Sequence, residues 1–160
     1  MGYLCKVERV HTDDLAIELL RSAAGLSRWA SRHADLEIPW AQARVLSLLD
    51  ELGPARITTL AEADATSQPT MTTQVQRLEA AGWTARTPDP ADGRATLVSL
   101  TAAGHDALAT ARRARAAALR PVLEQLAADP ERLRAATAVL TELLEATRTT
   151  PAREPGRTGS

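Results

Sequence analysis

The sequence predicts a mainly α-helical protein with one short β-hairpin, and three observations lead to this fold class. The chain has 160 residues, enough for one domain with helical extensions. Its aromatic residues are three Trp and one Tyr, with no Phe, so Ala, Leu and Val must build the core, which favours helices. Apolar residues recur at steps of three and four until Gly82, where the period changes for a short stretch.

The first helix is expected to begin at Thr12, after an N-terminal tail over residues 1–11. Thr is a good N-cap, and Asp13 and Asp14 place negative charge at the positive end of the helix dipole. This helical segment is assigned to residues 12–38. One of its faces collects Leu15, Leu19, Ser22, Leu26, Trp29 and His33.

Two helices of unequal length come next. Residues 40–52 follow a proline and carry apolar side chains at helical spacing, and Gly53-Pro54 ends this helix. Thr58 or Thr59 is then expected to cap a short third helix that reaches Ala65.

The fourth helix has the clearest division into an apolar and a polar face. Ser67 is its expected N-cap and Gly82 its expected C-cap. Met71, Val75 and Leu78 follow one another at i, i+4 and i+7, so we expect them to face the core. The opposite face is polar and stays available for a partner.

A two-stranded hairpin follows the fourth helix. Residues 83–87 and 95–100 are predicted strands, and the turn-rich segment 88–93 connects them. Two closely spaced helices followed by such a hairpin form a winged helix-turn-helix, which we assign to residues 39–100.

The C-terminal segment 101–147 predicts two more helices. Thr101 caps a long helix that reaches about residue 128 and is bent near Pro121, and a last helix starts at Asp129. Residues 148–160 are polar and are expected to form a disordered tail. One small winged domain cannot bury all the apolar faces of the flanking helices, so we expect these helices to pair with a second copy of the chain.

An ordered set of short motifs runs through residues 40–104. The motifs are Gln42-x-x-Val45-Leu46, Leu60-Ala61-Glu62, Ser67-Gln68-Pro69-Thr70-Met71-Thr72, Arg77-Leu78-Glu79-x-x-Gly82, Asp89-x-x-Asp92-Gly93-Arg94 and Leu100-Thr101-x-x-Gly104. No single motif is specific, but the ordered set resembles a MarR-type transcriptional regulator. This resemblance implies a homodimer that binds a pseudo-palindromic operator in double-stranded DNA, usually as a repressor relieved by a small ligand or an oxidant.

The fourth helix and the hairpin carry the predicted DNA contacts. A helix in the major groove needs a polar face, where Gln reads adenine and Thr contacts thymine methyl groups or phosphates. Arg94 is expected to enter the minor groove, with Asp92 holding its guanidinium, and Arg86 to contact a phosphate. The predicted set is Ser67, Gln68, Thr70, Thr72, Thr73, Gln76, Arg77, Arg86, Asp92 and Arg94. Many proteins that the chain resembles carry Arg at the position of Thr73, which leaves the operator sequence open.

Charge constrains this interpretation. The chain has a formal charge of −1, and four arginines face five acidic residues between Pro54 and Leu100. The predicted DNA-binding segment is therefore not basic. Affinity must depend on a few well-placed arginines, on helix N-termini that face phosphates, and on two copies acting together.

A small aromatic or anionic effector is the expected signal, because the resemblance implies a ligand between the dimer helices and the winged domain. The candidate residues are Trp29, His33, Trp40 and Arg44. The alternative for His33 is a satisfied histidine of the core. Cys5, with Tyr3 nearby, is the alternative sensor, because some proteins that the chain resembles detect peroxides through one cysteine near the N-terminus.

Other function classes find less support in the sequence. Neither a P-loop, a nucleophile elbow nor a Rossmann glycine pattern is present, and the histidines lack metal-ligand spacing, so we expect no enzyme, metal or cofactor. No apolar stretch predicts a membrane span or a secretory signal, so we expect a cytoplasmic protein that associates with the nucleoid when bound to DNA. A winged helix that binds another protein remains the contrasting alternative.

Overall fold

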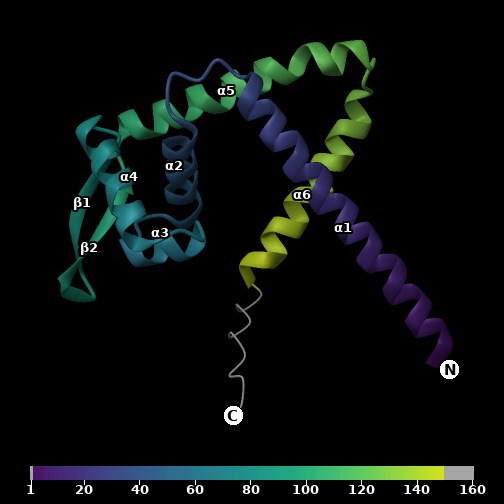
Figure 1. Ribbon diagram of the computed structural model, residues 1–160, viewed down its shortest axis with the longest axis horizontal. Helices are drawn as coiled ribbons and strands as arrows, with labels where there is room; N and C mark the ends of the chain where they lie inside the picture. The colour runs from purple at the N-terminus through teal and green to yellow at the C-terminus, as the bar shows by residue number, and fades with distance from the viewer. Residues whose placement is uncertain (1, 150–160) are drawn as a thin grey trace. The chain divides into compact units, whose positions relative to one another are not determined.

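The computed structural model describes residues 2–149, with side chains described for residues 12–147 (Figure 1). The described residues form two compact units, which divide between Leu119 and Arg120. The elements are α1 (Gly2–His33), α2 (Trp40–Leu52), α3 (Ile57–Ala63), α4 (Gln68–Ala80), β1 (Thr84–Asp89), β2 (Asp92–Leu100), α5 (Ala102–Gln125) and α6 (Pro130–Thr149). The predicted order of helices around one hairpin is confirmed for the described part of the chain.

The core of the first unit lies where α2, α3, α4 and the hairpin meet (Figure 1). Met71, Val75 and Leu78 are fully buried, as predicted from their spacing on α4. They belong to one cluster with Leu46 of α2 and Leu60 of α3, which are also fully buried. Each large side chain buried in this way contributes about 1.5–3 kcal/mol. Burial of this stripe fixes which face of α4 points outward.

Both ends of α4 are set by the residues predicted to cap it. The Ser67 hydroxyl accepts a hydrogen bond from the Thr70 amide at 3.3 Å. At the other end Gly82 has a φ of 74°, and its amide donates to the Glu79 carbonyl at 2.9 Å. The Trp83 amide donates to the Leu78 carbonyl at 2.9 Å, which completes a Schellman motif. Glycine adopts this φ without a steric cost, so Gly82 turns the chain from α4 into β1.

The hairpin is longer than predicted. β1 and β2 pair antiparallel from Thr84 opposite Leu100 to Asp89 opposite Asp92, so most of the expected connection 88–93 belongs to the strands. The Asp89 carboxylate accepts a hydrogen bond from the Ala91 amide at 2.9 Å, and this bond stabilises a two-residue turn.

Two helix boundaries correct the sequence analysis. α1 begins at Gly2, so the predicted tail over residues 1–11 is wrong, and Thr12 lies inside the helix. Residues 3–11 contain neither Pro nor Gly, and a Thr in a helix interior costs only a few tenths of a kcal/mol, so nothing ends the helix there. The N-cap of α3 is Arg56 rather than Thr58 or Thr59.

The boundaries of α5 and α6 agree more closely. The Thr101 hydroxyl accepts a hydrogen bond from the Gly104 amide at 3.0 Å, and the Asp129 carboxylate accepts one from the Glu131 amide at 2.9 Å. The predicted Thr101 cap is confirmed, and the last helix starts at Asp129 as predicted. α5 ends at Gln125, and the predicted bend near Pro121 falls at the boundary between the two units. α6 continues to Thr149, two residues past its predicted end at residue 147, and residues 150–160 lie outside the described part of the chain.

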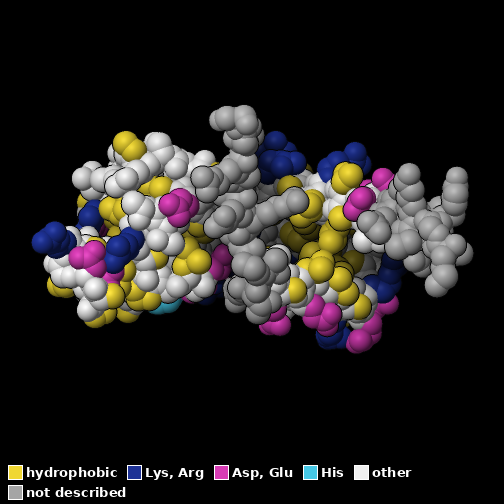
Figure 2. All heavy atoms as spheres, turned by 90° about the horizontal axis from the view of Figure 1, so that it is seen from below, with side chains coloured by type: hydrophobic (Ala, Val, Ile, Leu, Met, Phe, Trp, Pro, Cys, Tyr) yellow, Lys and Arg dark blue, Asp and Glu magenta, His cyan; other side chains and the backbone are white. Residues whose placement is uncertain are grey.

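Large apolar side chains of α1 and α6 are exposed in the single chain. On α1 they are Leu15, Ile17, Leu19, Leu20 and Leu26, and on α6 they are Leu133, Val139, Leu140, Leu143 and Leu144. The exposed fractions reach 70% at Leu20 and 63% at Leu144. Apolar side chains are also open to view on the face that Figure 2 presents. The face predicted for α1 is therefore largely uncovered within one chain.

Gly104 marks the closest approach between α5 and the start of the hairpin. A Cβ added at Gly104 would lie 2.0 Å from the Trp83 carbonyl oxygen, which also accepts a hydrogen bond from the Thr101 amide at 3.1 Å. The backbone must shift to relieve this clash. We expect Gly104→Ala to lower the free energy of unfolding by about 1–3 kcal/mol, measured by urea denaturation.

Gly25→Ala is the matched control. Gly25 lies inside α1, and no atom comes within 4 Å of an added Cβ. Alanine is the better helix former, so this change is expected to raise the free energy of unfolding by about 0.5–1 kcal/mol. Equal losses at the two glycines would contradict the close approach at Gly104.

Candidate nucleic-acid interface

The outward face of α4 carries the predicted polar side chains. Exposed on it are Ser67, Gln68, Thr70, Thr73, Gln76 and Arg77, while Thr72 is half-buried. The Thr72 hydroxyl donates to the Gln68 carbonyl at 2.8 Å, and the Thr73 hydroxyl donates to the Pro69 carbonyl at 3.1 Å. The hydroxyl hydrogens of both threonines are thus satisfied within the helix. Their methyl groups and oxygen lone pairs remain for a partner.

The first turn of α4 offers few backbone donors. Pro69 has no N–H, the Thr70 amide donates to the Ser67 hydroxyl, and the Met71 amide donates to the Ser67 carbonyl at 3.0 Å. The expected contribution of this helix N-terminus to phosphate binding is accordingly small. Any anion beside it must be held mainly by side chains.

The wing presents Arg94 without a charged partner. The Arg94 side chain is exposed, and its guanidinium makes no ion pair or hydrogen bond with the side chains described for residues 12–147. Asp92 does not hold this guanidinium, contrary to the prediction. Its carboxylate accepts from the Arg94 backbone amide at 3.1 Å and lies 3.5 Å from Nη2 of Arg56. Asp92 therefore shapes the backbone that presents Arg94.

Arg56 ties the wing to the helix-turn-helix. Its Nε and Nη2 both donate to Oδ2 of Asp89, at 2.8 and 2.6 Å. The backbone hydrogen bond from Ala91 and the bonds from Arg56 hold the pKa of Asp89 below its ordinary value, and the Asp89 hydrogen bond raises the pKa of Arg56. The sequence analysis missed Arg56, although the two aspartates of the wing motif each require a counter-charge.

Arg86 is held by an acidic residue of α4. Its Nε and Nη2 donate to the two oxygens of Glu79, at 2.7 and 3.2 Å. This two-bond geometry connects β1 to α4. The predicted phosphate contact of Arg86 stays a prediction, but its geometry favours a structural role.

Ion pairs explain how a segment with a negative formal charge can still present cations to a partner. Among the five acidic residues between Pro54 and Leu100, Asp64 pairs with Arg44, Glu79 with Arg86, and Asp89 and Asp92 with Arg56. Basic and acidic side chains also lie next to each other on the face shown in Figure 2. Within the same segment Arg77 and Arg94 have no charged partner among the described residues. A segment with a negative formal charge thus presents two unpaired cations.

The four predicted effector residues do not gather around one cavity. Trp29 stacks on His33 with ring centroids 4.3 Å apart, and Nδ1–H of His33 donates to the Trp29 carbonyl at 2.9 Å. His33 is exposed, so the alternative of a core histidine is wrong. Arg44 hydrogen-bonds Asp64.

Trp40 lines a cavity of about 290 Å³. Arg28, Ser31 and Arg32 of α1 form the rest of its wall. The guanidinium carbon of Arg115 lies 5.2 Å from the centroid of the Trp40 ring, a cation–π distance. The sequence analysis missed Arg28 and Arg32 as site residues, although their helical spacing places them on one face of α1.

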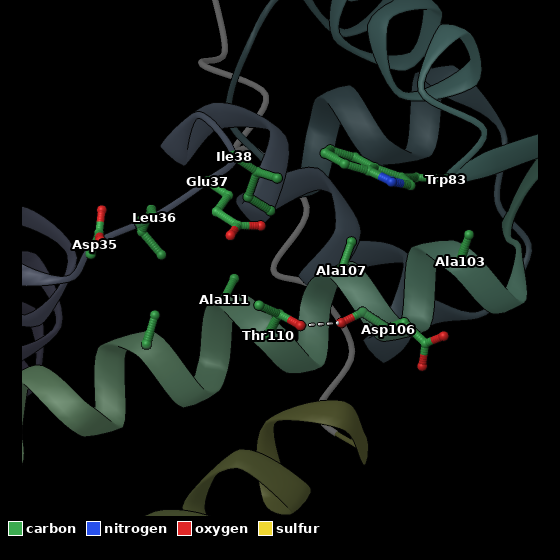
Figure 3. A pocket seen from close by; sticks show the side chains of 11 residues that line it. Asp35, Leu36, Glu37, Ile38, Trp83, Ala103, Asp106, Ala107, Thr110 and Ala111 are labelled. Carbon is green, nitrogen blue, oxygen red and sulfur yellow. Dashed lines mark hydrogen bonds between the residues drawn. The ribbon is translucent and has the colours of Figure 1, made fainter.

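Another cavity, of about 320 Å³, lies between the α1–α2 connection and α5 (Figure 3). Its wall combines Trp83 and small apolar residues of α5 with three acidic residues, Asp35, Glu37 and Asp106. No motif predicted this cavity. Its acidic wall is unsuited to phosphate, so it is distinct from the face that α4 and the wing present.

Helices α3 and α4 with the β1–β2 wing define a winged helix-turn-helix, a DNA-binding class of fold. Residues 38–96 match the sequence model of the MarR family. The chain has the fold of MarR family transcriptional regulators, and the predicted resemblance is confirmed. Two solved structures that the chain resembles, at 25% and 26% identity, are a transcriptional regulator from Thermotoga maritima and a putative transcriptional regulator from Pseudomonas aeruginosa.

Three solved structures illustrate this similarity. RV1404 from Mycobacterium tuberculosis is 28% identical, with 91% of this chain and 97% of that chain covered and a TM-score of 0.60. A putative transcriptional regulator from Pseudomonas aeruginosa is 26% identical, with 88% and 97% covered and a TM-score of 0.66. A MarR family protein from Bacillus stearothermophilus is 22% identical, with 88% and 98% covered and a TM-score of 0.64. No curated protein matches the sequence significantly.

Two features are absent from the described residues. They contain no group of His, Cys, Asp and Glu side chains placed to hold a metal ion. None of the described helices has the length and apolar character that a membrane span needs.

Asp89 links the stability of the wing to pH. Its pKa is lower in the folded chain than in the unfolded chain, so its contribution to stability is present at neutral pH and is lost as the pH falls below about 4. We expect Asp89→Asn to be less stable than the unmodified chain at pH 7, with a difference that shrinks between pH 4 and pH 3. Urea denaturation across this range measures it.

Glu62→Gln is the control, because Glu62 makes no ion pair within the described residues. Its stability is expected to follow that of the unmodified chain at every pH. An Asp89→Asn difference that stays constant from pH 7 to pH 3 would show that the carboxylate charge is not responsible.

Proposed function

We propose that this protein is a transcriptional repressor that binds a pseudo-palindromic operator as a homodimer and is released by a small ligand. The observation that carries the proposal is the pair of unpaired arginines, Arg77 on α4 and Arg94 on the wing, on a MarR-type fold. Every other arginine of the segment 54–100 is held by a carboxylate. The two free cations stand on the two elements that a winged helix-turn-helix applies to DNA.

In this proposal α4 enters the major groove and the wing reaches the adjacent minor groove. Gln68 and Gln76 have the donor and acceptor pair that reads adenine, and the methyl groups of Thr72 and Thr73 suit thymine. Arg77 binds a guanine edge or a phosphate. Arg94 is free to enter a narrow A·T-rich minor groove, where negative potential is concentrated. The protein acts in the cytoplasm, at the nucleoid when it is bound.

The homodimer is supported by the exposed apolar residues of α1 and α6. Soluble monomers rarely leave so many leucines uncovered on two helices, because their hydration is unfavourable. A second copy of the chain would bury them. Two copies would also double the number of arginines that meet the DNA, which a weakly charged domain needs.

The cavity at Trp40 supports an anionic aromatic effector. It combines an indole ring with two arginines of α1, and Arg115 lies over the same ring. A ligand that prefers a dimer spacing unsuited to DNA would weaken binding by population shift. Titration of aromatic carboxylates against the protein–DNA complex tests this part of the proposal.

Two alternatives remain. The side chain of Cys5 lies outside the described residues, so redox sensing through it stays a prediction. A winged helix that binds a protein instead of DNA is the second alternative. The salt dependence of binding distinguishes the two, because phosphate contacts release counterions and DNA affinity therefore falls steeply as the salt concentration rises.

Arg94→Ala is expected to reduce affinity for DNA at least about tenfold while the chain remains folded and dimeric, because a charged minor-groove contact is lost. Mobility-shift titrations with a duplex selected from a random library measure this loss. Arg134→Ala, on α6 and paired with Glu131, is the control and is expected to leave affinity unchanged. Unchanged affinity of Arg94→Ala would remove the wing from the proposed interface.

Leu140→Lys is expected to shift the dimer toward monomers at micromolar concentration, because it places a charge in the apolar face of α6. Ala138→Lys adds the same charge on the opposite side of the helix and is expected to leave the dimer intact. Analytical ultracentrifugation compares the two variants. A Leu140→Lys variant that sediments as a stable dimer would place the interface elsewhere.

A further inference from the structure

A third cavity lies between the wing and the start of α4, with a volume of about 330 Å³. Its polar wall residues are Arg56, Thr58, Gln68, Arg94 and Thr96, and the rest of the wall is Ile57 and Ala95. Two guanidinium groups thus line it, and no carboxylate does. The aspartates that pair with Arg56 lie outside this wall, so the interior is cationic although the surrounding wing is neutral.

Arg56 is fixed by hydrogen bonds that leave part of its guanidinium available for a ligand. Oδ2 of Asp89 accepts hydrogen bonds from both Nε and Nη2 of Arg56. Because Asp89 is only 8% exposed, it fixes the position of the guanidinium. The described residues supply no acceptor for Nη1, and 42% of the Arg56 side chain is exposed. A guanidinium already fixed by one carboxylate loses little conformational entropy when it binds a second oxyanion.

The position of the cavity relates it to DNA. One side is the first residue of α4, Gln68, and the other is the wing from Arg94 to Thr96. If α4 occupies the major groove and the wing the next minor groove, the sugar–phosphate strand that separates the two grooves must pass between these elements. The cavity stands at this crossing.

We infer that Arg56 binds a backbone phosphate of the DNA in this cavity, with Thr58 and Gln68 beside it. This inference rests on the proposed function and adds a contact that carries no sequence information. Side chains must provide it, because Pro69 and the Ser67 cap remove most backbone donors from the first turn of α4. Arg94 remains free to extend past the phosphate into the minor groove.

Salt dependence of DNA binding tests the inference. Each phosphate contact adds about 0.9 to the slope of log affinity against log salt, so Arg56→Gln in a dimer is expected to lower this slope by about 1.8. The variant is also expected to bind selected and unrelated duplexes more weakly by the same factor, about tenfold, because a phosphate contact reads no base. Arg56→Lys keeps the charge and is expected to retain the slope. Arg134→Gln, on α6, is the control for loss of a paired arginine and is expected to change neither slope nor affinity.

Asp89→Asn separates phosphate binding from a purely structural role. It removes the charged anchor but leaves the cation, so the salt slope is expected to stay as in the unmodified chain. An Asp89→Asn variant that reproduces the loss seen with Arg56→Gln would overturn the inference, because Arg56 would then act only by holding the wing. An unchanged salt slope for Arg56→Gln would overturn it too.

A neutral methylphosphonate placed at successive positions of the selected duplex gives a second measurement. At one position per half-site, between the two grooves, it is expected to weaken binding of the unmodified chain but not of Arg56→Gln. If Arg56→Gln fails to fold, the scan with the unmodified chain still tests the inference. The inference is overturned if no methylphosphonate position between the two grooves weakens binding. Failure of the unmodified chain to select any DNA would instead refute the proposed function itself.

Discussion

Burial of the apolar stripe of α4 is the constraint on which the rest of the structure depends. Met71, Val75 and Leu78 have no exposed surface, and together with Leu46 and Leu60 they form the centre of the core. A helix of 13 residues with three such anchors cannot rotate about its axis without exposing them. The polar face of α4 therefore points outward in one fixed orientation. The turn at Gly82 then leads the chain directly into the β1–β2 wing.

The second organising feature is the way that charge is distributed. Arginines and acids are nearly balanced in the winged segment, yet the fold pairs Arg56 and Arg86 with carboxylates and leaves Arg77 and Arg94 without a charged partner among the described residues. Ion pairs at a surface contribute little to stability, but they cancel negative charge that would repel DNA. Placement rather than net charge then determines where an anion can approach.

Local chemistry explains where the sequence predicted well and where it did not. Ser67 and Thr101 cap helices as expected, and Asp129 caps the helix that was expected to start there, because a side-chain oxygen finds its donor two or three residues away. Thr12 is not an N-cap, because no helix-breaking residue precedes it and α1 continues through it from Gly2. The partner of Asp92 was also wrong, since Arg56 lies 36 residues away in sequence and only the folded wing brings the two side chains together.

By itself the sequence determined the order of the elements, the buried face of α4 and the two arginines that stand on α4 and on the wing. These follow from periodicity and capping, which act over a few residues. Only the tertiary structure decided which arginines are neutralised, which aromatic residues line cavities, and that Arg56 faces a cavity free of carboxylates. Those outcomes depend on side chains distant in sequence, whose meeting is set by packing and not by local pattern.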